Sequence, residues 1–387
     1  MTPLYFDYAA TTPVDPQVAE AMSRCLTLEG NFANPASRSH RYGWQAEQAV
    51  ENARRQVADC IHADPREVVF TSGATESNNL ALKGVVEALK QKEPTQPLHI
   101  ITSLIEHKAV LDVVAWLEKQ GVEVTYLSPD ADGLIHPSQV TDALRKDTCL
   151  VSLMAVNNEL GTITNIQAIG EALKHHTAYL HVDAAQAIGK IKVNVNDWGV
   201  DLLSISSHKF YGPKGIGALY VRREPQVPVA AQIHGGGHER GMRSGTLATH
   251  QIVGMGLAAQ LVSEHLEEER TRLEMLNQKL WQGLTAIGDV FLNGHIEQRT
   301  PNHLNVSVAG VDGEILLASL AKIAVSSGSA CNSATVAPSY VLKAIGRSDE
   351  LAHAGLRFSL GRFTTEEEVE AAVVEVARVV QTLRKIA

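Results

Sequence analysis

Short apolar runs rich in β-branched residues alternate with longer helical patterns along the middle of the chain. The runs are "EVVFTS", "HIITS", "VEVTYLS", "CLVSLMAV", "AYLHVDAA", "DLLSISS" and "GALYVRR". Residues of this kind favour strands, and strands separated by helices run parallel to one another in one sheet. A parallel sheet needs cover on both of its faces. The pattern therefore predicts an α/β fold with a mostly parallel sheet between two layers of helices.

The pattern changes after about residue 260, where a long charged helix, "SEHLEEERTRLEMLNQKLWQGL", precedes a shorter mixture of strands and helices. We expect a second, smaller α+β domain to begin there. The last helix is the clearest element, because Thr365 and Glu368 have the spacing of a capping box. Its apolar residues recur on one face: Val369, Val373, Val376, Val380 and Leu383.

Composition and charge exclude several classes of protein. The chain has 387 residues, 44% of them hydrophobic, and a formal net charge of -9 without a lysine- or arginine-rich block, so nucleic acid is not an expected partner. The N-terminus "MTPLYFDYAATTP" is no secretory signal, and the apolar stretches are too short to span a bilayer. We expect a cytoplasmic protein without a membrane partner. Its four cysteines lack C-x-x-C spacing, which predicts free thiols and no metal site.

Polar residues follow several of the expected strands, and ligands of such folds bind beyond the carboxyl ends of the strands. In "FTSGATESNN", Gly73 permits a tight turn and Thr75 can cap the next helix, whose open N-H groups would face an anion. An ordinary capped helix explains the same residues. His107 ends the strand "HIITSLIEH" and could lie against a planar ring, although a structural histidine is the alternative.

An aspartate and a lysine follow two strands that should lie near each other. Asp183 in "HVDAAQAIG" comes directly after a buried strand, with Gln186 three residues later. Lys209 in "SISSHKFYGPKGIG" follows an apolar strand and precedes a glycine-rich turn, so its amine should be partly buried, which lowers its pKa. A capping aspartate and a solvated surface lysine are the alternatives. Taken together, however, the two residues match what pyridoxal phosphate requires of a protein: an aspartate that faces its pyridinium nitrogen and a lysine that forms an imine with it.

The sequence resembles the cysteine desulfurases of iron-sulfur cluster assembly, within the class V aminotransferase-like, pyridoxal-phosphate-dependent enzymes. The resemblance covers essentially the whole chain through "DYAATTPVDP", "NPASRSHRYGWQAE", "FTSGATESNN", "VNNELG", "HVDAAQ", "SSHKFYGPKG", "HGGGHERGMRSGT", "SSGSACNSA", "PSYVL" and "RFSLGRFTTEEEV". It implies the type I aminotransferase-like fold. A large cofactor-binding domain would span residues 16–259, and residues 1–15 and 260–387 would form the small domain.

The resemblance implies a role for each residue that matches a family motif. Lys209 would bind pyridoxal 5'-phosphate covalently, Asp183 would face the ring nitrogen, and His107 would stack on the ring and move protons. Arg357, with Asn34, would bind the substrate carboxylate, for which a planar guanidinium is well suited. The remaining cofactor contacts would be Ala74, Thr75, Asn158, Gln186, Ser206, His208 and Thr246. Of these, Thr246 would come from the second subunit of a homodimer.

Cys331 lies in "SSGSACNSA", a run of small and polar residues that predicts a mobile segment. The pattern by itself also fits an exposed loop with an incidental thiol. The resemblance implies that Cys331 attacks the sulfur of L-cysteine as a thiolate, giving L-alanine and a persulfide on Cys331. The sulfur would pass to acceptors such as an iron-sulfur scaffold. The chain ends at "LRKIA", before the short tail with which housekeeping relatives dock on that scaffold, so docking there is not implied.

Other functions are open at this point. One is a selenocysteine lyase or another class V lyase, and another is a non-catalytic sulfur-relay protein. A hydrolase that uses Cys331 with a histidine is less suitable, because acyl-transfer nucleophiles are held rigidly. The glycine-rich "HGGGHERG" does not give G-x-G-x-x-G between a strand and a helix, which excludes a dinucleotide site there. Ser207 stands where close relatives often have glycine, a change that should not disturb Lys209.

Overall fold

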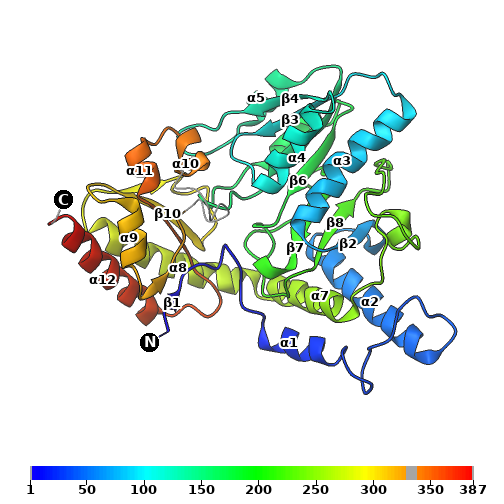
Figure 1. The fold of residues 1–387 in the computed structure, drawn as a ribbon, viewed down its shortest axis with the longest axis horizontal. Coiled ribbons are helices and arrows are strands. Elements are labelled where there is room, and N and C mark those ends of the chain that lie inside the picture. The colour runs from blue at the N-terminus through cyan, green and yellow to red at the C-terminus, as the bar shows by residue number, and fades with distance from the viewer. Residues whose placement is uncertain (1, 328–337, 386–387) are drawn as a thin grey trace.

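The computed structural model describes residues 2–327 and 338–385, and these residues form three sheets, the largest with seven strands (Figure 1). Its strands, in spatial order, are β2 (Val68–Thr71), β8 (Gly217–Val221), β7 (Leu202–Ser206), β6 (Tyr179–Asp183), β5 (Thr148–Met154), β3 (His99–Ser103) and β4 (Glu123–Leu127). β8 is antiparallel to both of its neighbours, β2 and β7, and all other pairs of adjacent strands in this sheet are parallel. The predicted strands are all present, and the mostly parallel sheet is confirmed.

Helices cover both faces of this sheet (Figure 1). One face packs against α3 (Ala74–Lys92) and α4 (Lys108–Glu118), and the other packs against α1 (Pro16–Ser23), α2 (Arg41–Cys60), α5 (Pro137–Ala143), α6 (Ile166–Leu173) and α7 (Thr249–Glu264). Successive side chains of a strand point to opposite faces. Val69 and Leu202 therefore belong to the core with α3, whereas Phe70 and Leu203 belong to the core with α2.

A second core lies around a three-stranded antiparallel sheet in the order β12 (Gly355–Ser359), β10 (His303–Val308) and β9 (Val290–Asn293). The nearby helices are α8 (Leu266–Thr285), α9 (Gly313–Ser319), α10 (Tyr340–Ala344), α11 (Asp349–His353) and α12 (Glu366–Leu383). The N-terminal β1 (Leu4–Tyr5) pairs parallel with β11 (Ile323–Ala324), so the start of the chain lies among C-terminal elements (Figure 1). The domain boundaries stay a prediction, and a boundary at residue 260 would fall within α7.

The capping box at Thr365 is confirmed, but the long charged helix differs from the prediction. His265 ends α7, and α8 starts at Leu266 rather than at Ser263. The break has a packing cause, because the end of α7 contributes Leu261 to the core of the large sheet, whereas Leu276 of α8 belongs to the second core. Among residues 2–327 and 338–385, no helix has the length and apolar character needed to cross a membrane.

A buried ion pair fixes the glycine-rich segment "HGGGHERG" against the large sheet. Arg54 of α2 donates to both carboxylate oxygens of Glu239, at 2.7 and 2.8 Å, and the two side chains are 4% and 2% exposed. Glu239 also accepts the N-H of Phe70 in β2 at 2.7 Å, and the guanidinium of Arg54 lies over the Phe70 ring. Glu239 and Arg240 have positive φ angles, so the pair stabilises a backbone turn that non-glycine residues seldom adopt.

Replacing Arg54 with methionine should destabilise the fold strongly, because it leaves the Glu239 carboxylate buried without its partner. We expect the free energy of unfolding, measured by urea denaturation, to fall by about 3–5 kcal/mol. The matched control is Lys279→Met, which removes a surface amine paired with Glu366 and Glu370 and should change the transition little. Equal effects of the two substitutions would show that the Arg54–Glu239 pair does not hold this segment.

A candidate active site at the carboxyl edge of the sheet

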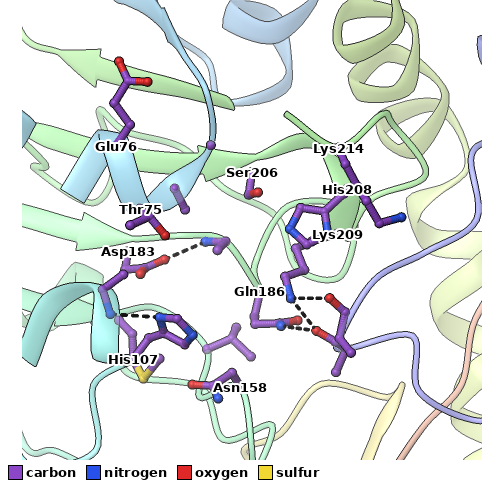
Figure 2. A pocket seen from close by; sticks show the side chains of 18 of the residues that line it. Thr75, Glu76, His107, Asn158, Asp183, Gln186, Ser206, His208, Lys209 and Lys214 are labelled. Atoms are coloured by element: carbon purple, nitrogen blue, oxygen red, sulfur yellow. Dashed lines mark hydrogen bonds between the residues drawn. The ribbon is translucent and has the colours of Figure 1, made fainter. Parts of the chain in front are cut away.

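A cavity of about 480 Å³ lies at the carboxyl ends of the parallel strands (Figure 2). Ten residues predicted from the sequence line it: Ala74, Thr75, His107, Asn158, Asp183, Gln186, Ser206, His208, Lys209 and Arg357. They come from the segments that follow β2, β3 and β5, from the ends of β6 and β7, and from β12. Parallel strands bring residues that are far apart in sequence to the same edge.

Three predicted residues are not placed in this cavity. Asn34 is exposed, and its side chain accepts the N-H of Ala36 at 2.9 Å. Thr246 is also exposed, and neither residue lines the cavity of its own chain. Cys331 lies outside the described residues.

The start of α3 forms an anion cradle, but Thr75 is not its cap, so that prediction was wrong. Gly73 is the N-cap, with φ 148°, and no side chain caps the helix. That φ is one that glycine adopts far more easily than other residues. The neighbouring Gly217 of β8 must also lack a side chain, because a Cβ on it would lie 2.6 Å from the Cα of Gly73. The first-turn N-H groups of α3 therefore stay available to an anion, with Thr75 in the first turn and Ser206 beside it (Figure 2).

An acidic residue at this cradle is neutralised by an ion pair. Arg243 donates to the Glu76 carboxylate through Nε at 2.8 Å, and the N-H of Ser72 donates to it at the same distance. Burial acts to raise the pKa of Glu76, but these hydrogen bonds outweigh it and hold that pKa below its usual value. The sequence analysis missed both residues of the pair. The sequence held one signal for this pair: Glu76 is an acidic side chain in the first turn of the helix after Gly73.

Asp183 is held by two donors. Its Oδ2 accepts from Nδ2 of Asn78 at 2.8 Å and its Oδ1 accepts from the N-H of Ala185 at 2.9 Å. The carboxylate is buried and lines the cavity, so it can receive a proton-bearing ring nitrogen. Asn78 was missed by the sequence analysis. It lies on the inner face of α3, and helical periodicity alone gives no reason to assign it a role.

Two further buried carboxyl groups lie behind the cavity. Burial raises the pKa of Glu106 to about 8, although Ser103 and the N-H of Met154 donate to it. Burial likewise raises the pKa of Glu159 to about 7, and Ser339 donates to its Oε2. Near neutral pH, Glu106 is therefore largely protonated and Glu159 is about half protonated, so they add less negative charge around Asp183 than two ordinary carboxylates would.

Lys209 lies at the end of a 3₁₀ turn, Ser207–Lys209, directly after β7. Its Nζ donates to the carbonyl oxygens of Ala9 and Ala10, each at 2.7 Å, and Gln186 donates to the same Ala9 oxygen at 2.8 Å (Figure 2). Burial, together with the charge of Lys209, lowers the pKa of His208 to about 4, so this imidazole is neutral. The amine therefore points into the cavity beside an uncharged ring.

His107 does not end a strand, contrary to the prediction. β3 ends at Ser103, and a turn leads to His107, which is the N-cap of α4. Its Nδ1 accepts the N-H of Ala109 at 3.1 Å. Because Nδ1 is an acceptor here, the proton of the neutral ring is on Nε2. The cap fixes the orientation of an imidazole that lines the cavity.

Arg357 of β12 reaches the cavity from the second core. Its Nη2 is 2.7 Å from Oδ1 of Asp7, and its Nη1 donates to the carbonyl of Asn158 at 2.9 Å. Within the described residues, Nε of Arg357 and Oδ1 of Asn158 are buried without a hydrogen-bond partner. Such atoms are costly unless a ligand pairs with them. Asp7 was missed, because nothing in "DYAATTP" predicts a partner 350 residues away.

These residues fit pyridoxal 5'-phosphate. Lys209 supplies an amine, Asp183 supplies a fixed carboxylate, and the open start of α3 supplies N-H groups for a phosphate. The buried unpaired Oδ1 of Asn158 leaves an acceptor for a further group. Among the described residues, no group of three or more histidine, cysteine, aspartate or glutamate side chains could hold a metal ion.

Comparison with known proteins agrees with this geometry. The family model described as "Aminotransferase class-V" matches residues 4–372. "Cysteine desulfurase IscS" of Photobacterium profundum is 58% identical over 382 residues, which are 99% of this chain and 94% of the relative. The protein of the same name from Acinetobacter baumannii strain AYE is 60% identical over 385 residues, with the same coverage.

Two solved structures extend the comparison to the fold. A "NifS-like protein" superposes with a TM-score of 0.90 at 36% identity, covering 99% of this chain and all of the other. "SspA in complex with cysteine" superposes with a TM-score of 0.82 at 41% identity, covering 94% of this chain and all of that one. With the family model matched over almost its whole length, the chain belongs to the class V aminotransferase family.

Proposed function

We propose that the protein is a pyridoxal-phosphate-dependent cysteine desulfurase that converts L-cysteine to L-alanine and supplies sulfur for iron-sulfur cluster assembly. The convergence of Lys209, Asp183 and Arg357 in one cavity carries this proposal, because it joins cofactor chemistry to a cation for an amino-acid carboxylate. Relatives about 60% identical bear the name cysteine desulfurase. The structural neighbour SspA was solved with cysteine.

The cofactor would be held by the residues of the sheet edge. Lys209 would bind it covalently, and Asp183 would accept a hydrogen bond from its ring nitrogen. Its phosphate would lie at the start of α3. The other proposed contacts are Ala74, Thr75, Asn158, Gln186, Ser206 and His208 from this subunit and Thr246 from a second one.

The substrate carboxylate would pair with Arg357. Asp7 and the Asn158 carbonyl hold the guanidinium in place, while its buried Nε keeps a donor available. Arginine suits this task because its planar fork matches a carboxylate. Asn34 remains a proposed contact, although its side chain lies outside the cavity of this chain.

Proton transfer and sulfur transfer would use different residues. When bound, pyridoxal phosphate withdraws electrons from the α-carbon of an amino acid. His107, whose Nε2 carries the ring proton, would donate it to the reacting substrate. The Cys331 thiolate would attack the substrate sulfur, so that an S-S bond forms as the substrate C-S bond breaks and its electrons stay with carbon. Protonation of that carbon gives L-alanine, and Cys331 keeps the sulfur as a persulfide.

Replacing Cys331 with serine should separate cofactor binding from sulfur transfer. The variant should keep the cofactor absorbance, because no proposed cofactor contact changes. Alanine formation from L-cysteine should fall about 1,000-fold or more, since a hydroxyl is scarcely ionised at neutral pH. Alkylation of the wild type should have the same effect, and Cys149→Ser, which removes a buried thiol, is the matched control. Alanine release at the wild-type rate by C331S would indicate a lyase that expels sulfide directly.

Replacing Lys209 with alanine should abolish the covalent cofactor linkage and its absorbance, as well as alanine formation. Lys214 also lines the cavity and is the matched control: Lys214→Ala should keep the linkage, because that lysine lies beyond the 3₁₀ turn that follows β7. Both variants can be compared by absorbance and by mass spectrometry after borohydride reduction. A reduced cofactor adduct that persists in K209A would place the covalent bond elsewhere.

The protein would work as a homodimer. Thr246 is exposed and lies outside its own cavity, so it could serve the phosphate site of a second copy. Light scattering should therefore give a dimer, and Thr246→Val should speed cofactor loss on dialysis. The control is Thr271→Val on the exposed face of α8. A monomer that retains its cofactor fully would overturn the shared site.

The acceptor of the sulfur would be another protein, such as an iron-sulfur scaffold. We propose the cytoplasm as the compartment, since Cys25, Cys60 and Cys149 are free thiols and disulfides are rare there.

A further inference from the structure

A second lysine lies directly behind the proposed cofactor lysine. Lys190 follows β6 in the segment "DAAQAIGK". Its Nζ donates to Oε1 of Gln186, the side chain that shares the Ala9 carbonyl with Lys209. Lys190 and Lys209 also line one small cavity together. The two amines are therefore neighbours, joined through Gln186 and Ala9.

No described carboxylate balances the charge of Lys190. Glu269 lines the same small cavity, but its carboxylate pairs with Arg362. The charged groups that act on Lys190 are the cations Lys209 and Arg357. A further positive charge close to Lys209 and Arg357 is unfavourable. The protonation of Lys190 therefore depends on the charges of these two neighbours.

The other ionisable groups around Lys190 are largely uncharged near neutral pH. Burial, together with the charges of nearby lysines, lowers the pKa of His208 to about 4 and that of His303 well below its usual value. Burial raises the pKa of Tyr8 and of Tyr211. The negative charge of Asp7 is paired with Arg357. Lys209 is thus the principal partner with which the charge of Lys190 is coupled.

We propose that Lys190 is a positioning residue of the active site: its amine fixes the carboxamide of Gln186 and stands as a second amine behind Lys209. The proposal rests on the proposed function only for the roles given to Lys209 and Gln186. The contacts on which it rests are made by residues of this chain alone.

The first consequence is the orientation of Gln186. Lys190 donates to Oε1, and the Ala9 carbonyl can only accept, so both partners require Nε2 to face Ala9. A carboxamide nitrogen has two hydrogens. One bonds to Ala9, and the other remains for an oxygen atom in the cavity, which Gln186 lines beside Lys209 (Figure 2). Lys190 thereby presents Gln186 as a donor.

The second consequence is the charge state of Lys190. Burial lowers the pKa of Lys190 well below its usual value, and the positive charges of Lys209 and Arg357 act in the same direction. These influences favour an uncharged amine, which can still donate to Oε1 of Gln186. Lys190 can therefore orient Gln186 without adding a second positive charge beside Lys209.

Competitive labelling of the full-length protein without cofactor would test the charge state of Lys190. Acetic anhydride is applied over a pH series, and mass spectrometry gives the apparent pKa of Lys190. That pKa should lie about one unit or more below the usual value of a lysine, and Lys209→Met, which removes the neighbouring positive charge, should raise it. Lys192→Met, at an exposed lysine two residues later, is the matched control and should match the wild type. An ordinary lysine pKa for Lys190 in the wild type would overturn its role as an uncharged donor.

Cofactor loss on dialysis of the holoenzyme would test the contact with Gln186. Lys190→Met should lose cofactor about 10-fold faster, and Lys190→Gln, which keeps a donor for Gln186, should lose it more slowly than Lys190→Met. Equal rates for Lys190→Met and the wild type would overturn the positioning of Gln186. If Lys190→Met does not fold, the apparent pKa of Lys190 in the wild-type protein still decides whether it is an uncharged donor. A wild-type protein without cofactor absorbance would overturn the proposed function, while the labelling would still test Lys190.

Discussion

The common direction of the strands in the large sheet is the constraint on which the site depends. β3, β5, β6 and β7 all run the same way, so the segments after them open at one edge. Asp183 and Ser206 end two adjacent strands, and Asn158 follows a third. A reversal of one of these strands would send its polar residue to the opposite edge. β8 is the strand that reverses, and it contributes close backbone packing against Gly73 instead of a side chain.

The N-terminal stretch then joins this edge to the second core. β1 pairs with β11, so the chain begins beside C-terminal elements. A few residues later, Asp7 pairs with Arg357 and the Ala9 carbonyl accepts from Lys209. The proposed carboxylate-binding and cofactor-binding cations are therefore attached to one short segment. That segment sets their separation, through the Asp7 side chain for Arg357 and the Ala9 carbonyl for Lys209, which leaves little freedom for either cation.

The electrostatics of the cavity follow from burial. Burial leaves Glu106 largely protonated and Glu159 about half protonated near neutral pH, and Glu76 is neutralised by Arg243. Asp183 lines the cavity itself, where its carboxylate accepts hydrogen bonds from the side chain of Asn78 and the N-H of Ala185. Burial thus reduces the acidic charge behind the cavity, and two hydrogen bonds fix the carboxylate that faces it.

Local sequence determined the strands, the last helix and the strand-end residues such as Lys209. Apolar periodicity, capping residues and glycines act within a few residues, so they can be read along the chain. The resemblance to a known family added roles for Arg357 and Cys331. The reversal of β8, the N-cap at Gly73 and the helix break at His265 required the tertiary structure.

The contacts of the site residues could not be predicted from the sequence either. They are Asp7 with Arg357, Asn78 with Asp183, Arg243 with Glu76, and Lys190 beside Lys209. Periodicity says which face of an element is buried, but a polar contact forms only where two elements meet in space. That meeting is decided by the packing of whole layers, which no short stretch of this chain encodes alone.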